Sequence, residues 1–219
     1  MYFENRHHAG RVLAGALSRY RGRPDAVVLA LPRGGVPVAF EVAEALDAPL
    51  DIFVVRKLGF PGHEEVAIGA IASGGIRILD DRLIARYRIS PDAVARVSAR
   101  EEAELERRER LYRGGRSPAP VEGKTVILVD DGLATGSSMR AAVAAIRSRH
   151  PARIVVAVPV GPRETVQELS RHADEVVCAA MPEPFDAVGR FYADFEQTTD
   201  AEVGELLSRA HAPAAAGIS

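Results

Sequence analysis

Short continuous runs of Val, Ile, Leu and Ala recur along the chain, and most are followed by a segment whose apolar residues repeat every three or four positions. Such runs are typical of buried β-strands, and the three-to-four spacing is typical of amphipathic α-helices. Buried strands that alternate with helices indicate an α/β, doubly wound fold, with a mainly parallel five-stranded sheet and helices on both faces. The predicted strands are 26–31, 50–55, 126–129, 154–159 and 175–178, and the predicted helices are 6–20, 36–46, 139–149 and 200–209.

The alternation stops between residues 58 and 123, which predicts an insertion. Residues 67–72 and 76–79 predict a β-hairpin around Ser73-Gly74-Gly75. Residues 91–113 predict a long helix with Glu and Arg residues three or four positions apart, a pattern more typical of a solvated, ion-paired face than of a nucleic-acid site. The expected organisation is one domain over 1–219 with the insertion at 58–123, a hood contribution from 181–209 and a tail at 210–219.

Composition and charge narrow the class of protein. The formal net charge is −2 and the sequence pI is about 6.3, so no global field attracts nucleic acid or an anionic membrane. The single cysteine, Cys178, leaves no internal disulfide and fits a reducing compartment. No apolar run approaches the roughly 20 residues that span a bilayer, and the polar N-terminus is unlike a secretory signal. We expect a soluble cytoplasmic protein without nucleic-acid or membrane partners, and a homodimer is left open.

The most informative segment is VILVDDGLATGSSM, residues 126–139. A predicted strand ends in two adjacent carboxylates, Asp130 and Asp131, and a short Gly/Thr/Ser loop then leads into a predicted helix. The free N–H groups and the positive end of a helix suit a phosphate group. Carboxylates one loop away accept hydrogen bonds from ribose hydroxyls or organise a hydrated Mg²⁺. The segment therefore predicts a sugar-phosphate site.

Three other interpretations compete for the same segment. A Walker B strand requires a G-x-x-x-x-G-K-[ST] loop, but Pro118 stands at the leading glycine position before Gly123-Lys124-Thr125, and a strand follows instead of a helix. An aspartyl-phosphate phosphatase would have the spacing D-x-D-G, whereas the two carboxylates here are adjacent. A plain strand-to-helix turn, capped by Asp and Ser, has no such conflict and stays open beside the sugar-phosphate site.

Two further elements carry positive charge after a predicted strand. In Pro32-Arg33-Gly34-Gly35, the glycines let backbone N–H groups close on an anion, and the Arg33 guanidinium suits phosphate oxygens. The alternative is a turn that only reverses the chain. Arg56 and Lys57 end an apolar predicted strand before a flexible stretch at 59–65, and the alternative is two surface cations. His63 lacks the His or Cys neighbours of a protein metal site.

These elements together resemble the type I phosphoribosyltransferase family. The strand, acidic pair and T-G-S loop of 126–138 are similar to its phosphoribosyl pyrophosphate (PRPP) motif, and residues 31–37 are similar to its pyrophosphate-binding loop. Arg56-Lys57 and the loop after it resemble the strand-end pair and mobile loop of orotate phosphoribosyltransferases. The combination LPRGGVPVAFEVA, VVRKLG and VDDGLATG looks most like bacterial phosphoribosyltransferases of unassigned substrate. The resemblance covers roughly residues 26–160.

The resemblance implies nucleophilic substitution at the ribose anomeric carbon, with pyrophosphate leaving and Mg²⁺ as cofactor. Mg²⁺ would be bound through PRPP oxygens, with Asp130 and Asp131 as candidate protein contacts, and not in an all-protein cage. The implied catalytic residues are Arg33, Lys57, Asp130 and Asp131, and the implied PRPP- or phosphate-binding residues are Pro32, Gly34, Gly35, Arg56, Ala134, Thr135, Gly136, Ser137 and Ser138. The Arg33 turn and the Arg56-Lys57 pair would face pyrophosphate, the acidic pair the ribose hydroxyls, and residues 134–138 the 5′-phosphate.

The acceptor is implied only as a nitrogenous, nucleobase-like molecule. In hypoxanthine-guanine enzymes a third carboxylate, three residues after the second member of the acidic pair, serves the purine N7, and this chain has Ala134 there. Purine salvage by that mechanism is therefore not expected. The acceptor-binding hood would come from the N-terminus, 58–123 or 181–192. The aromatics of the last stretch either stack on a base or close the core under the helix 200–209, and they are Phe185, Phe191, Tyr192 and Phe195.

Two functions fit the resemblance. The first is an active phosphoribosyltransferase, and the second is a non-catalytic PRPP or nucleotide sensor on the same fold, as in purine and pyrimidine operon regulators. Regulators usually carry an added winged-helix domain or a basic face for nucleic acid. We expect no extra domain here, and the net charge is −2, so the sequence favours the enzyme.

Overall fold

A five-stranded parallel sheet forms the centre of the molecule in the computed structural model, which describes residues 2–60 and 63–211, without the side chains of 63–66. Its strands lie in the order β2-β1-β6-β7-β8, and every neighbouring pair is parallel. The strands are β1 (Ala26–Ala30), β2 (Leu50–Ile52), β6 (Thr125–Val129), β7 (Arg153–Val160) and β8 (Glu175–Ala180).

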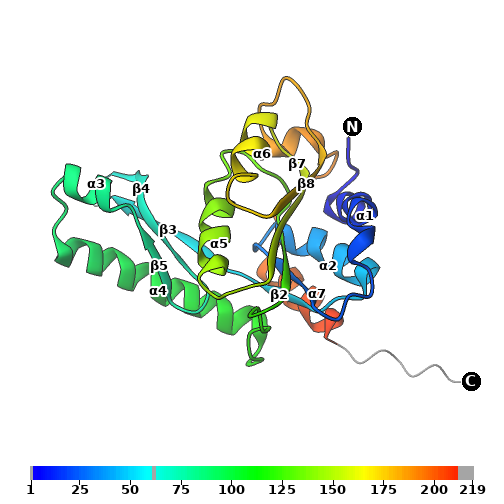
Figure 1. Ribbon diagram of the computed structural model, residues 1–219, viewed down its shortest axis with the longest axis horizontal. Helices are drawn as coiled ribbons and strands as arrows, with labels where there is room; N and C mark the ends of the chain where they lie inside the picture. Colours follow the sequence, from blue (N-terminus) through cyan, green and yellow to red (C-terminus); the bar gives the residue numbers. More distant parts are fainter. Residues whose placement is uncertain (1, 61–62, 212–219) are drawn as a thin grey trace, which may run out of the picture.

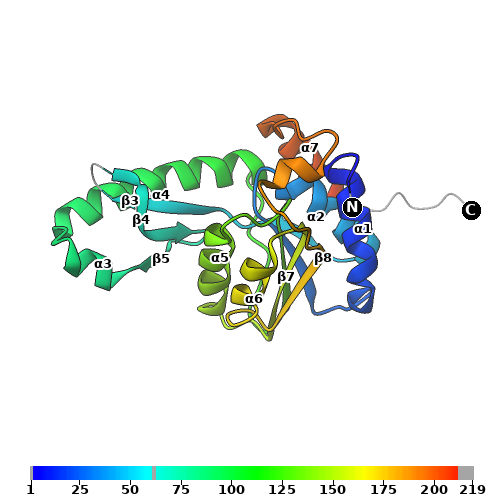
Figure 2. The same ribbon diagram turned by 90° about the horizontal axis from the view of Figure 1, so that it is seen from above.

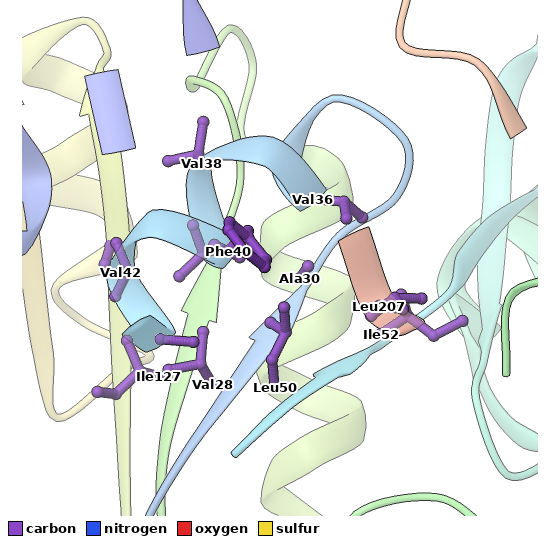
Figure 3. Close-up of a cluster of buried hydrophobic side chains, with 14 of the residues drawn as sticks. Val28, Ala30, Val36, Val38, Phe40, Val42, Leu50, Ile52, Ile127 and Leu207 are labelled. Carbon is purple, nitrogen blue, oxygen red and sulfur yellow. The ribbon is translucent and has the colours of Figure 1, made fainter. Parts of the chain in front are cut away.

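Helices cover both faces of this sheet, which confirms the predicted doubly wound fold (Figures 1 and 2). Successive side chains of a strand point to opposite faces, so Val28 packs against α2 and α7 on one side and Val27 packs against α5 on the other. Figure 3 shows the first of these two clusters, with Phe40 of α2 above the strands. The helices are α1 (Arg6–Ala16), α2 (Gly35–Leu46) and α7 (Asp200–Ala210) on that side, and α5 (Ser137–Arg147) and α6 (Arg163–Leu169) on the other, with short 3₁₀ helices at Ser18–Tyr20 and Val188–Phe191.

A second unit, which we call the arm (residues 55–113), projects away from the central sheet (Figures 1 and 2). Leu58, Ile68 and Ile71 of its sheet belong to the same buried cluster as Leu105 of α4, while the opposite face turns toward α5. Its elements are the antiparallel strands β3 (Val55–Phe60), β4 (His63–Ala72) and β5 (Ile76–Leu79), then α3 (Asp81–Arg86) and α4 (Pro91–Arg113). The predicted hairpin and the predicted bounds of the long helix are confirmed.

The predicted strand 50–55 is wrong, and with it the position of Arg56 and Lys57. Strand β2 ends at Ile52, and Val55 begins β3, in which Arg56 pairs with Ile71 and Lys57 with Ala70. The chain stays buried while it passes between the two sheets, so hydrophobicity gives no sign of the change. Arg56 and Lys57 therefore lie inside an antiparallel strand, and the stretch expected to be flexible forms the ends of β3 and β4, with residues 61–62 outside the described residues.

The charged face of α4 is ion-paired along its own length, as its sequence pattern predicts. Glu104 accepts hydrogen bonds from Arg107 and Arg108 at 2.7 Å each, and Glu106 accepts one from Arg110 at 3.1 Å. Within the described ranges, no helix is long and apolar enough to cross a membrane. Of the predicted tail, Ala210 belongs to α7 and residues 212–219 lie outside the described residues.

Candidate active site

The turn at residues 32–35 and the segment at residues 130–138, both of which the sequence assigns to phosphate or ribose binding, meet where the strand order of the sheet reverses. Strands β1 and β6 are neighbours, and Ala30 pairs with Val129, so both strands end at the same level. The chain then leaves toward α2 on one face and α5 on the other. In open α/β sheets this switch point is the crevice where ligands bind. The turn after β1 and the acidic pair after β6 therefore lie side by side.

The turn after β1 packs directly on the acidic pair, which explains both of its glycines. A Cβ atom on Gly35 would lie 2.8 Å from the Val129 carbonyl oxygen and 2.9 Å from the Cα of Asp130, and one on Gly34 would collide with the Asp131 carboxylate. Any side chain at these positions would separate the two motifs. The peptide bond between Pro32 and Arg33 is cis.

Arg33 extends from this turn toward the first residue of α7. Its Nη1 atom lies 3.6 Å from Oδ1 of Asp200, and about a third of the Arg33 side chain is exposed. The same Asp200 oxygen accepts a 2.6 Å hydrogen bond from the Tyr112 hydroxyl of α4. Burial, together with Asp200, raises the pKa of Tyr112 to about 12, so the phenol stays protonated as a donor. Arg33 is thus held beside Asp200 with part of its guanidinium exposed, so it stays accessible to an anion.

The acidic pair leaves one oxygen of each carboxylate available to a ligand. Oδ1 of Asp130 accepts a 2.9 Å bond from the Asp131 amide, and Oδ2 of Asp131 accepts a 2.8 Å bond from Nε of Arg6. Among the described residues, no hydrogen bond or ion pair reaches Oδ2 of Asp130 or Oδ1 of Asp131. Burial and the neighbouring carboxylate raise the pKa of Asp130 well above its usual range. Burial also raises the pKa of Asp131, although Arg6 opposes this shift.

The Thr135–Ser138 loop begins α5 and is fastened to α6. Gly136 has a φ of 68° and precedes the first residue of α5, whose first-turn amides have no acceptor within the helix, and the Ser137 amide donates a long 3.4 Å bond to the Thr135 hydroxyl. The Thr165 hydroxyl donates to the Ala134 carbonyl at 3.0 Å, and Arg140 bridges the Thr135 carbonyl and Glu168 at 3.3 and 2.9 Å. A Cβ atom on Gly136 would meet the Thr165 methyl group at 2.7 Å, so a side chain there would disturb α6 as well as the loop.

Arg56 and Lys57 point to opposite sides of the arm. Arg56 donates to Oε2 of Glu101 at 2.9 and 2.6 Å, so its guanidinium is engaged with α4. Lys57 lines a cavity of about 870 Å³ between the arm and α5, together with Ser137 and Arg140. The structure therefore places Lys57 at a cavity that borders the Thr135–Ser138 loop. Among the described residues, neither Arg56 nor Lys57 has a recorded contact with Arg33.

Sequence patterns missed two residues that hold the acidic pair, Arg6 and Tyr192. The Tyr192 hydroxyl donates to the main-chain carbonyl of Asp131 at 2.6 Å, and burial raises the pKa of this phenol. Arg6 lies 125 residues before its partner Asp131. One signal was present: Arg6 is the first residue of α1, a position where the helix dipole disfavours a cation.

The aromatic residues between 185 and 195 pack on one another, but not under the helix 200–209 as one alternative predicted. Phe185 and Phe191 are stacked with ring centroids 5.3 Å apart, and Tyr192 lies 5.4 Å from Phe3. Their cluster lies against the end of β7 and not under α7, whose apolar residues pack with α2. Phe195 differs because the guanidinium of Arg6 lies over its ring, 3.9 Å from the centroid.

The donor set around the acidic pair suits a shared magnesium ion better than a protein cage. Over residues 2–60 and 63–211, no group of three or more His, Cys, Asp or Glu residues could hold a metal ion. Two adjacent carboxylates with free oxygens match the way Mg²⁺ is usually held, through one or two carboxylates, water and substrate phosphates.

Comparisons with known proteins agree on one family. A phosphoribosyl transferase domain model matches residues 3–195. Two Mycobacterium tuberculosis proteins named as candidate phosphoribosyl transferases, MT0597 and Rv0571c, are each 46% identical over 209 residues, which is 95% of this chain and 47% of theirs. The chain thus spans about half the length of these curated relatives.

Solved structures share the fold. TT1426 from Thermus thermophilus superposes with a TM-score of 0.84 at 44% identity, over 95% of this chain and 99% of that one. AQ2163 from Aquifex aeolicus has a TM-score of 0.51 at 11% identity, over 92% of this chain and 84% of that one, which is a likeness of fold alone.

Proposed function

Because the chain belongs to the phosphoribosyl transferase family, we propose that it transfers the 5-phosphoribosyl group of PRPP to a nitrogenous, nucleobase-like acceptor with release of pyrophosphate. One observation carries the proposal: the free oxygens of the acidic pair, the Arg33 turn and the N-terminus of α5 meet at the switch point of the sheet. These groups match the ribose hydroxyls, the pyrophosphate and the 5′-phosphate of one PRPP molecule.

The reaction is a substitution at the anomeric carbon of ribose. A bond forms from the acceptor nitrogen to this carbon, and the bond to the pyrophosphate oxygen breaks with its electron pair on the leaving group. The transition state resembles an oxocarbenium ion, so the protein acts mainly by positioning the reactants and by neutralising the leaving group. We assign the ribose hydroxyls to Asp130 and Asp131, and the pyrophosphate to Arg33 and the amides of Gly34 and Gly35.

The 5′-phosphate would bind the amides and hydroxyls of residues 134–138 at the start of α5. Lys57 lines the adjoining cavity with Ser137, which supports a contact from that side of the ligand. Arg56 would have to break its ion pair with Glu101 to reach the ligand, so we do not assign it a direct contact with PRPP. Magnesium would be held by PRPP oxygens and by Asp130 or Asp131, and it would offset the charge of the pyrophosphate.

The partners that this site supports are small molecules, namely PRPP and the acceptor. We further infer a cytoplasmic location from the single cysteine. Burial raises the pKa of the Cys178 thiol to about 11, which keeps it protonated and unreactive.

Two measurements test the function. Calorimetry should show PRPP binding that requires Mg²⁺ in the wild type, and loss of that binding in the double variant Asp130→Asn/Asp131→Asn, because amides cannot replace carboxylates as anionic partners. Pyrophosphate release from PRPP should then be followed with a panel of nitrogenous bases. Failure of the wild type to bind PRPP would refute the proposal, whereas tight binding without turnover on any acceptor would point to the non-catalytic sensor.

A further inference from the structure

Two segments that are far apart in the sequence form a small structure at the acidic pair, which we call the clasp (residues 3–6 and 191–196). The Phe3 amide donates to the Phe191 carbonyl at 2.7 Å, and the Ala193 amide donates back to the Phe3 carbonyl at 2.7 Å. The Asp194 amide then donates to the Glu4 carbonyl at 2.8 Å. This pairing sets the position of Arg6, which follows two residues after Glu4.

The clasp fixes the guanidinium of Arg6 from three directions. Nη1 donates to the Glu196 carbonyl at 2.6 Å, the centroid of the Phe195 ring lies 3.9 Å from Cζ, and Nε donates to Asp131 at 2.8 Å. Only 11% of the Arg6 side chain is exposed. A long side chain with this many partners has one geometry, and its entropy is lost before any ligand arrives.

The hydrogen bond from Arg6 determines which oxygen of Asp131 is available to a ligand. Because Oδ2 is bound to Nε of Arg6, the carboxylate plane is fixed and Oδ1 is the oxygen left for a ligand. Asp130 is fixed in the same way by the Asp131 amide. Among the ion pairs of the described residues, Arg6 is also the cation that contacts this pair, so it offsets part of the repulsion between two adjacent carboxylates.

We propose that Arg6 is a positioning residue of the phosphoribosyl site, which holds Asp131 so that one oxygen of each aspartate faces the two ribose hydroxyls. The proposal rests on the proposed function and deepens it, because it assigns recognition of the ribose to the clasp as well as to the acidic pair. Among the described residues, Arg6 makes no hydrogen bond to the turn at residues 32–35 or to the loop at residues 134–138, although its Nε packs beside Gly34, where an added Cβ atom would lie 3.3 Å from it.

The test compares three ligands that use different parts of the site: ribose 5-phosphate, 2-deoxyribose 5-phosphate and pyrophosphate. In Arg6→Gln, affinity for ribose 5-phosphate should fall by about tenfold or more, the range of a charge-assisted hydrogen bond, and the preference over the 2-deoxy sugar should shrink. Affinity for pyrophosphate should fall much less than affinity for ribose 5-phosphate, because the recorded hydrogen bonds of Arg6 go to Asp131 and Glu196 and not to the Gly34 turn. Arg6→Lys keeps the positive charge but not the planar guanidinium group, so its affinity for ribose 5-phosphate should lie between those of Arg6→Gln and the wild type.

Arg11→Gln is the matched control, because Arg11 lies on the same helix, is 56% exposed in its side chain and, among the described residues, has its one ion pair with Glu41, at 3.6 Å. Equal affinity for ribose 5-phosphate in Arg6→Gln and Arg11→Gln would overturn the inference and leave the proposed function intact. Tighter binding in Arg6→Gln would also overturn it, since Arg6 would then be blocking the site. A wild type that binds none of the three ligands would refute the proposed function itself. Thermal unfolding of each variant shows whether the fold is kept, and Arg6→Lys carries the test if Arg6→Gln does not fold.

Discussion

Arg113, in the last turn of α4, donates a 3.0 Å hydrogen bond from Nε to Oδ1 of Asp51 in β2, the edge strand of the central sheet. Both residues are buried, with exposed fractions of 6% for Arg113 and 5% for Asp51. Asp51 also accepts the amide of Ala119 at 2.8 Å, and Arg113 donates to the Ile52 carbonyl at 2.9 Å. This buried pair therefore fastens the arm, and with it Lys57, to the sheet that carries the acidic pair.

We predict that Asp51→Ala lowers the free energy of unfolding by about 3 kcal/mol, because the buried Arg113 guanidinium loses Asp51 and the Ala119 amide loses its acceptor, while Glu109 still pairs with Arg113 at 2.7 Å. Urea denaturation measures this. The control is Arg110→Ala, which removes an exposed ion pair with side chains 70% and 56% accessible and should cost about 1 kcal/mol or less. Similar costs for the two variants would show that the Asp51 pair is no anchor.

We predict that replacing one acidic residue changes the pH dependence of stability in the ligand-free protein. The folded-state pKa of Asp130 is raised by burial and by Asp131, so its contribution to stability is fully present below the ordinary pKa of 3.8 and is lost as pH rises through the raised value. Asp130→Asn has no such loss. The melting temperature of Asp130→Asn minus that of the wild type should therefore grow as the pH rises from the ordinary pKa of 3.8 through the raised pKa. Parallel curves for the two proteins would contradict the raised pKa.

We predict that two cations of the site act on different ends of PRPP. Arg33→Ala should weaken PRPP and pyrophosphate by about tenfold or more and ribose 5-phosphate much less, since Arg33 belongs to the turn that we assign to pyrophosphate. Lys57→Ala should weaken ribose 5-phosphate as well as PRPP, because Lys57 shares its cavity with Ser137. Calorimetry with the three ligands decides both assignments. The assignment of Arg33 is wrong if its loss affects ribose 5-phosphate and PRPP equally.

We predict little or no phosphoribosyl transfer to hypoxanthine or guanine. A general base for the purine N7 must stand within about 3 Å of it or one water away, and Ala134 carries no proton acceptor on its side chain. The carboxylate of Asp186 is nearby in sequence to the clasp, but it is paired with Arg190 at 3.7 Å and is 62% exposed. Nucleotide formation from PRPP should be assayed with each purine. Turnover of about 1 s⁻¹ or more, the ordinary enzyme range, would refute this prediction.

Local patterns predicted the parts of the structure that are local in origin. Apolar runs located the central strands, and helical spacing with charged pairs located α4 at residues 91–113. The acidic pair and the glycine turns could be predicted because each is a short motif, and the residues that determine its backbone conformation are adjacent in the sequence. The arm strand β3 was missed since its apolar start continues from β2 without a polar break. The helices α3 and α6 have only 6 and 7 residues, which is too short for a periodic signal.

The contacts that hold the acidic pair were beyond these patterns for a different reason. Arg6 and Tyr192 reach Asp131 across 125 and 61 residues of chain, and nothing in the residues around either one indicates the partner. Their roles arise from the pairing of residues 3 and 191–193, which is a property of the folded chain.

The clasp also bears on the order in which the protein matures as it is synthesised. The Glu196 carbonyl that orients Arg6 is synthesised 190 residues after Arg6 itself. Contacts between such distant residues form late, after the loop between them has closed. A nascent chain can therefore form β1, β6 and the loops that follow them while Arg6 is not yet held in place to pair with Asp131. We expect ribose recognition to appear only after residue 196 has left the ribosome and is free to fold.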